Sequence, residues 1–149
     1  MRKLVLCGLL VPFVFLGQTP KIIVGIVVDQ MCYDYLYRFQ HHFSTDGFNR
    51  FLTSGVNCRN TNYNYVPTYT GPGHASIYTG TTPYNHGIVA NEWYDRTQAK
   101  GVNCVFDPSV QAVGNSSSGY GQVSPHHLET MTITDQLKFT YPASNVFSI

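Results

Sequence analysis

Residues 67–78 read P-T-Y-T-G-P-G-H-A-S-I-Y, and the fold is organised around this stretch. Thr70 stands where a helix N-cap is expected, and Pro72 falls in the first turn, where a missing N–H has no cost. Gly71 and Gly73 carry no side chains, so backbone N–H groups at the helix start can approach a ligand closely. The stretch therefore predicts a helix start of the kind that binds phosphate-like anions.

The hydroxyl of Thr70 has two interpretations on this evidence. It can cap the helix and do nothing else, or it can attack phosphorus, provided that a neighbouring group removes its proton. Thr68 is the rival nucleophile, but no glycine follows it directly. Residues 67–78 alone leave both interpretations of Thr70 open.

A continuous apolar run lies upstream, K-I-I-V-G-I-V-V-D at residues 21–29. A β-branched run without alternation is typical of a strand buried on both faces, as in a parallel sheet. The run ends in Asp29, and ligands of open α/β sheets bind outside the carboxyl ends of the strands. Asp29 is therefore either a site residue or the cap of a following helix.

The remaining segments alternate between helical and strand-like patterns. Helices are predicted for residues 33–43 and 47–54, with Gly55 just past the end of the second, and for a segment that starts at Ser124–Pro125. Short strands are predicted for residues 56–62, 101–106 and 145–149. This order favours an α/β fold with a layered, mostly parallel sheet flanked by helices.

The composition excludes several classes of protein. The chain has 149 residues, of which 43% are hydrophobic and only 11% charged, which indicates one folded domain rather than a disordered chain. Nine basic residues balance eight acidic ones and are scattered, so we expect no nucleic-acid partner and no stable membrane partner. The oligomeric state is left open.

Residues 1–18 have the layout of a secretory signal peptide. Arg2 and Lys3 precede an apolar run over residues 4–16, which is short for a membrane span. An uncleaved membrane anchor is the alternative. Export would place the protein in the periplasm or outside the cell, where disulfides form. We then expect a bridge between Cys58 and Cys104, each in a strand-like segment, and a reduced Cys32.

Asp29 and Thr70 are suited to share a metal ion. Zn²⁺ accepts carboxylate oxygen and lowers the pKa of a bound hydroxyl. Two such ions roughly 4 Å apart can hold the attacking and leaving oxygens of an in-line displacement. Asn91 would then serve as a neutral donor to a phosphoryl oxygen.

Five motifs carry a resemblance to a known family. They are I-V-V-D-Q-M at residues 26–31, Y-V-P-T-Y-T-G-P-G-H at 65–74, I-Y-T-G at 77–80, H-G-I at 86–88 and N-E-W-Y-D at 91–95. With these motifs the chain resembles the alkaline phosphatase superfamily. Within it, the chain is most similar to the secreted phosphate-irrepressible alkaline phosphatases of the type I phosphodiesterase/nucleotide pyrophosphatase-like branch. The resemblance runs from about residue 21 to the last residue.

The resemblance implies a role for each candidate site residue. Asp29 would ligate one zinc ion, and Thr70 would be the nucleophile, forming a phosphothreonine intermediate while it coordinates the same zinc. Asn91 would bind a phosphoryl oxygen. The family uses two Zn²⁺ ions, and the resemblance implies that their other Asp and His ligands follow residue 149.

Residues 21–149 are accordingly expected to form the N-terminal part of an alkaline-phosphatase-like catalytic domain, with little activity alone. The implied reaction is hydrolysis of small-molecule phosphate monoesters. The alternatives are a phosphodiesterase or nucleotide pyrophosphatase, and an inactive truncated product.

The histidines are not interpreted as metal ligands. The resemblance assigns zinc ligation to neither His74 nor His86, and both are expected to be hydrogen-bonded core or loop residues. The adjacent pairs His41–His42 and His126–His127 are expected on the surface.

Overall fold

The computed structural model describes residues 20–114 and 121–148. The predicted signal peptide lies outside these residues. The helices and strands, in chain order, are α1 (Tyr35–Arg38), η1 (Gln40–His42), α2 (Phe48–Ser54), α3 (Thr70–Thr79), α4 (Pro83–His86), β1 (Glu92–Asp95), β2 (Lys100–Asn103) and α5 (Ile133–Thr140). Among the described residues, none of these helices has the length and apolar character needed to cross a membrane.

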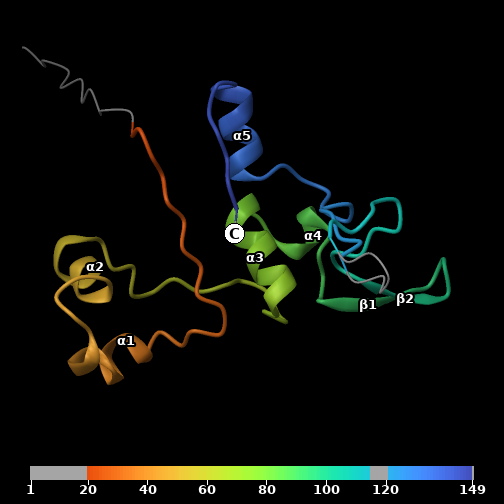
Figure 1. Cartoon of the computed structure of the whole chain (residues 1–149). Coiled ribbons are helices and arrows are strands. Elements are labelled where there is room, and N and C mark those ends of the chain that lie inside the picture. The colour runs from red at the N-terminus through yellow and green to blue at the C-terminus, as the bar shows by residue number, and fades with distance from the viewer. Residues whose placement is uncertain (1–19, 115–120, 149) are drawn as a thin grey trace, which may run out of the picture.

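Helix α3 lies at the centre of the structure (Figure 1). Helices α4 and α5 contact it directly. The β1–β2 hairpin lies on one side of α3, and α1 and α2 lie on the other, joined to it by extended chain (Figure 1). The buried apolar side chains of the described residues are Ile88, just after α4, and Val102, in β2. The packed core therefore lies between α3, α4 and the hairpin.

Helix α3 forms as residues 67–78 predict, with its start shifted by one residue. The N-cap is Tyr69, with an extended backbone, and Thr70 is the first helical residue and forms no capping bond. The expectation that Thr70 is the N-cap is therefore wrong, because its hydroxyl turns toward Asp29 instead. The helix ends where Gly80 adopts a left-handed backbone, with a φ of 68°, a conformation that glycine adopts without steric cost.

Residues 21–29 do not form the predicted buried strand. The segment is extended, but no strand pairs with it within the described residues, and Ile22 and Ile26 are 80% and 74% exposed. An apolar run indicates a preference for burial, whereas a strand also needs the backbone groups of a neighbour. The strands predicted at residues 56–62 and 145–149 are absent for the same reason, as far as they lie in the described part.

The sheet formed by the described residues is the antiparallel β1–β2 hairpin, in which Trp93 pairs with Val102. Its turn is closed by Asp95, whose Oδ1 accepts the N–H groups of Gln98 and Thr97. These bonds hold the pKa of Asp95 below its usual value. Strand β2 falls within the predicted strand at residues 101–106 apart from Lys100, whereas β1 was not predicted. The mostly parallel layer of the predicted α/β fold is not formed among the described residues.

The helix predictions had mixed outcomes. The helix at residues 47–54 is confirmed as α2, which begins after Gly47, and residues 33–43 contain the short helices α1 and η1. The helix predicted to start at Ser124–Pro125 is wrong, because α5 begins only after Thr132. There Thr132 Oγ1 accepts the N–H of Asp135, and Asp135 Oδ2 accepts the N–H of Thr132, which together form a capping box.

The three cysteines of the described residues are all free. The predicted bridge between Cys58 and Cys104 is therefore wrong, whereas the reduced state of Cys32 stays a prediction. The bridge was expected because both residues were placed in strands. Cys58 instead lies exposed in an irregular segment, and Cys104 is half-buried just after β2.

Candidate active site

Asp29, Thr70 and Asn91 come from three separate segments and meet at the N-terminal end of α3. The hydroxyl of Thr70 donates to Asp29 Oδ2 over 3.4 Å, a long hydrogen bond between residues 41 positions apart. The backbone N–H of Gly71 donates to Asn91 Oδ1 over 2.6 Å. All three side chains are exposed, so a ligand in solvent can reach each of them.

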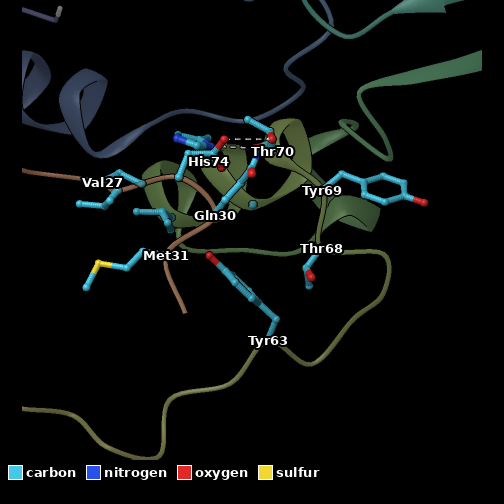
Figure 2. A pocket seen from close by; sticks show the side chains of 12 residues that line it. Val27, Gln30, Met31, Tyr63, Thr68, Tyr69, Thr70 and His74 are labelled. Carbon is cyan, nitrogen blue, oxygen red and sulfur yellow. Dashed lines mark hydrogen bonds between the residues drawn. The ribbon is translucent and has the colours of Figure 1, made fainter. Parts of the chain in front are cut away.

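A cleft of about 240 Å³ opens beside Asp29 and Thr70 (Figure 2). It is lined by residues of the extended N-terminal segment, of the approach to α3 and of α3 itself: Val27, Val28, Asp29, Gln30, Met31, Tyr63, Thr68, Tyr69, Thr70, Gly73, His74 and Ile77. Pockets for drug-sized ligands occupy roughly 300–1,000 Å³. The cleft is therefore suited to a small group.

The backbone turns sharply just after Asp29. Gln30 adopts a left-handed conformation with a φ of 57°, which is uncommon for a residue with a side chain and costs about 1 kcal/mol. Strained positions of this kind are concentrated at functional sites. The turn at Gln30 ends the extended segment at the point where the Asp29 carboxylate meets Thr70.

The side-chain amide of Asn91 has a fixed orientation. A backbone N–H can only donate, so the Asn91 atom that faces Gly71 must be the carbonyl oxygen Oδ1. The amide nitrogen Nδ2 therefore points away from Gly71, and it forms no hydrogen bond to any other described residue. This leaves two N–H groups of Asn91 free to donate to a ligand.

Close packing at Gly71 supports this arrangement. A Cβ atom at this position would lie 3.1 Å from Asn91 Oδ1 and 3.1 Å from Cys104 Sγ, which is tighter than nine in ten contacts of real Cβ atoms. Burial raises the pKa of the Cys104 thiol, which favours the neutral form of the sulfur that packs here. Glycine therefore allows the helix start to approach Asn91 closely.

The histidines near the site behave largely as predicted. His74 lines the cleft, and its Nδ1 donates to the backbone oxygen of Thr70 over 2.8 Å (Figure 2). His86 is buried and hydrogen-bonded to Ser76. Both are hydrogen-bonded, as predicted. His86 is a core residue, whereas His74 is half-buried within α3 and belongs to neither the core nor a loop.

The paired histidines lie away from the cleft. His41, His42 and His126 are exposed, as expected. His127 is half-buried, with its ring edge-on to Trp93, which corrects its surface assignment.

The described residues fit part of a metal site. Asp29 Oδ2 and Thr70 Oγ1 lie close enough to be neighbouring ligands of one ion, and Zn²⁺ accepts oxygen donors of both kinds. A structural or catalytic zinc site needs three or four protein ligands. Across residues 20–114 and 121–148, no three His, Cys, Asp or Glu side chains gather to hold a metal. Asp29 and Thr70 would supply two of these ligands.

Two features of the site were missed from sequence. The first is that Asn91 binds the Gly71 N–H, and the second is the buried bond between Ser76 and His86. Neither has a local signal, because each joins residues 10 or more positions apart. Gly71 stands out in the sequence because it follows Thr70, but its contact with Asn91 depends on how the chain returns after α4.

Comparison with known families gives a match over most of the chain. The family described as type I phosphodiesterase / nucleotide pyrophosphatase matches residues 23–140. The alkaline phosphatase PafA of Elizabethkingia meningoseptica is 49% identical over 118 residues, which are 79% of this chain and 22% of that protein. The alkaline phosphatase PhoV of Synechococcus elongatus is 46% identical over 131 residues, covering 87% of this chain and 24% of that protein.

A further relative bears a different name. The protein named calcium-transporting ATPase of Myroides odoratus is 48% identical over 121 residues, which are 81% of this chain and 22% of that protein. The chain therefore spans less than a quarter of the length of these relatives.

A solved structure supports the fold assignment. Wild-type alkaline phosphatase PafA superimposes with a TM-score of 0.84 at 46% identity, over 87% of this chain and 25% of that one. A variant of PafA with a substituted threonine, asparagine, lysine and arginine superimposes with a TM-score of 0.78 at 45% identity, over 80% of this chain and 23% of that one. The predicted alkaline-phosphatase-like α/β fold is thereby confirmed.

Proposed function

The chain belongs to the type I phosphodiesterase / nucleotide pyrophosphatase family of the alkaline phosphatase superfamily, and from this we propose that it carries the nucleophile of a phosphoric ester hydrolase. The proposed reaction is hydrolysis of small-molecule phosphate monoesters through a phosphothreonine intermediate on Thr70. We further propose that residues 21–149 form the N-terminal part of the catalytic domain.

One observation carries this proposal. The Thr70 hydroxyl, at the first residue of α3, points at the Asp29 carboxylate. Beside it lies the amide of Asn91, whose N–H groups bond to none of the described residues. The spacing of these residues supports it further. The threonine and asparagine substituted in the PafA variant are 21 positions apart in that protein, and Thr70 and Asn91 have the same separation.

Each residue has a defined task in the proposed reaction. Thr70 Oγ1 attacks the phosphorus atom and forms a new P–O bond while the ester oxygen leaves on the opposite side. The hydroxyl proton has one acceptor among the described residues, Asp29 Oδ2. Asn91 Nδ2 donates to a non-bridging oxygen, whose negative charge it stabilises. Water then cleaves the phosphothreonine, releasing phosphate and restoring Thr70.

We propose two Zn²⁺ ions as cofactors, with Asp29 and Thr70 among the ligands of one of them. When bound, zinc lowers the pKa of a coordinated hydroxyl, which favours the nucleophilic form of Thr70 at neutral pH. Asp29 then orients the hydroxyl and balances positive charge. Because the described residues supply only these two zinc ligands, we expect little activity from the 149 residues by themselves.

Export is proposed on the basis of residues 1–18, where Arg2 and Lys3 precede an apolar run. The proposed location is the periplasm or the cell exterior. N-terminal sequencing of the protein purified from the periplasm tests this, and a retained Met1 would contradict it.

Diester hydrolysis is the second candidate function, and the name of the matching family favours it. Asp29, Thr70 and Asn91 would have the same tasks in both reactions. The two candidates differ in substrate charge, since a monoester carries up to two negative charges and a diester one. Turnover of p-nitrophenyl phosphate against that of bis(p-nitrophenyl) phosphate separates them.

The experiment that tests the proposal compares two threonines of the cleft in the complete gene product, loaded with zinc. Thr70→Ala should lower kcat/KM for p-nitrophenyl phosphate by about 10³-fold or more, since it removes the nucleophile. Thr70→Ser should retain part of the activity. Thr68→Ala is the matched control, because Thr68 also lines the cleft, and it should change kcat/KM less than about 3-fold. Equal losses in Thr68→Ala and Thr70→Ala would contradict the proposal.

A further inference from the structure

His86 is the largest fully buried side chain of the described residues, with 0% exposed surface. It is the last residue of α4 and lies against α3. Burying an imidazole ring removes both of its nitrogens from water, so each nitrogen needs a partner within the protein.

Both ring nitrogens of His86 have a hydrogen-bond partner, and these partners determine which nitrogen carries the hydrogen. The backbone N–H of Ile88 donates to Nδ1 over 3.2 Å, so Nδ1 carries no hydrogen. Nε2 lies 3.0 Å from Ser76 Oγ, and in a neutral ring it must carry the hydrogen that Nδ1 lacks. Nε2 therefore donates to Ser76. Burial lowers the pKa of His86 from its ordinary value of 6.5, which favours this neutral form.

These hydrogen bonds connect α3 to the segment that leads from α4 to Asn91. Ser76 lies in α3, six residues after Thr70, and Ile88 lies three residues before Asn91. Asn91 in turn accepts the N–H of Gly71, at the start of α3. The segment that carries Asn91 is thus held to the helix that carries Thr70 at two points, one through Asn91 and one through His86.

A third segment, which contains His127 and Glu129, packs against the turn formed by His86 and Gly87. The N–H of Glu129 donates to the backbone oxygen of His86 over 3.1 Å. A Cβ atom at Gly87 would lie 2.9 Å from Glu129 Cγ and 2.9 Å from the backbone oxygen of His127. Glu129 is the titratable side chain that faces this turn from that segment, since His127 presents only its backbone oxygen there and packs its ring on Trp93. Tyr84 is the other titratable residue of α4. Helix α3 carries two titratable residues, His74 and Tyr78, each two positions from Ser76. The His74 ring bonds to the backbone oxygen of Thr70.

We propose that His86 is a positioning residue, whose neutral ring, bonded to Ser76 and to the Ile88 N–H, holds Asn91 in the register in which its amide meets Gly71. A protonated ring would place an N–H at Nδ1 against the N–H of Ile88 and break this link. The consequence for catalysis rests on the proposed function, in which Asn91 binds a phosphoryl oxygen.

The first test uses the unaltered, complete gene product, labelled with ¹⁵N in glycine and histidine. The ring nitrogen shifts of His86 should identify the tautomer with hydrogen on Nε2. As the pH is lowered from about 8 to about 5, the Gly71 N–H resonance should move with the same midpoint as His86. Hydrogen on Nδ1, or a Gly71 resonance that ignores the titration of His86, would overturn the proposal.

The second test is a double-mutant cycle with inorganic phosphate as the probe. His86→Gln loses the acceptor for Ile88, so it should shift the Gly71 resonance and raise the inhibition constant of phosphate by about 10-fold. In an Asn91→Ala background the same substitution should cause no further loss. A 10-fold loss in both backgrounds would mean that His86 acts without Asn91 and would overturn the proposal.

Two controls complete the design. His41→Gln replaces an exposed histidine of η1 and should change neither the Gly71 resonance nor phosphate inhibition. If Asn91→Ala alone leaves phosphate inhibition unchanged, the role of Asn91 in the proposed function fails, while the Gly71 resonance still reports on the positioning by His86. If His86→Gln does not fold, the tautomer and titration of the unaltered protein decide the matter.

Discussion

The backbone N–H of Gly71 donates to Asn91 Oδ1 over 2.6 Å. The first N–H groups of a helix have no partner inside it, and at α3 the side chain of Asn91 supplies one. This N–H was expected to be open to an anion, but Asn91 occupies it. The amide instead presents its own N–H groups on its other side. In the proposed function, Asn91 rather than the helix backbone therefore donates to a phosphoryl oxygen.

A methyl group at Gly71 should separate these partners. Gly71→Ala should lower kcat/KM by about 10-fold, because its Cβ would push against Asn91 Oδ1 and Cys104 Sγ, each at 3.1 Å. Gly73→Ala is the matched control, since its nearest neighbour is Tyr63 Oη at 4.0 Å. It should stabilise α3 by up to about 1 kcal/mol, as alanine does in helices, which urea unfolding measures. Full activity in Gly71→Ala would contradict the close packing.

Replacing Asn91 by aspartate tests its contact with Gly71 and its proposed contact with a phosphoryl oxygen separately. The carboxylate of Asn91→Asp can still accept the Gly71 N–H, but it cannot donate, and its charge repels a phosphoryl oxygen. We expect kcat/KM for p-nitrophenyl phosphate to fall by roughly 10²–10³-fold. The loss should be smaller for a diester, which carries less charge. A variant that binds inorganic phosphate as tightly as the original protein would refute this role.

Part of the site could be predicted because its residues have local signals. Thr70 stands in a glycine-rich helix start, and Asp29 ends an apolar run, so each could be found from its neighbours alone. That the two side chains meet in the structure follows from how residues 21–31 pass beside α3. The roles of these residues remain predictions.

The other features of the fold depend on contacts between residues far apart in the sequence, and no local sequence pattern encodes such contacts. The apolar run at residues 21–29 was interpreted as a buried strand, but strand formation needs a neighbouring strand, and none of the described residues supplies one. The start of α5 was misplaced for a different reason. Ser124–Pro125 resembles a helix start, but Ser124 donates its hydroxyl to Asp107 instead of capping a helix. The actual start of α5 has a local signal in the sequence, because Thr132 and Asp135 are spaced as a capping box.

Asp107 should make the stability of the fold depend on acid pH. Its buried carboxylate accepts the hydroxyls of Ser109 and Ser124, and these bonds lower its pKa from 3.8 to about 2. Because the folded pKa is depressed, this stabilisation is complete above pH 3.8 and is lost as the pH falls toward about 2.

Thermal unfolding between about pH 5 and pH 2 measures this effect. Asp107→Asn should lower the melting temperature at neutral pH and flatten its fall at acid pH. Asp46→Asn, at an exposed aspartate, is the control and should leave the profile unchanged. Parallel profiles of Asp107→Asn and the original protein would show that Asp107 has no such role.

The identity of the nucleophile is the central claim, and trapping the covalent intermediate tests it most directly. The complete, zinc-loaded gene product is mixed with p-nitrophenyl phosphate, quenched in acid within the first turnover and digested for mass spectrometry. We expect a phosphoryl group on Thr70, which disappears in Thr70→Ala and persists in Thr68→Ala. A phosphoryl group on Thr68, or turnover with no phosphorylated residue in the active enzyme, would contradict it.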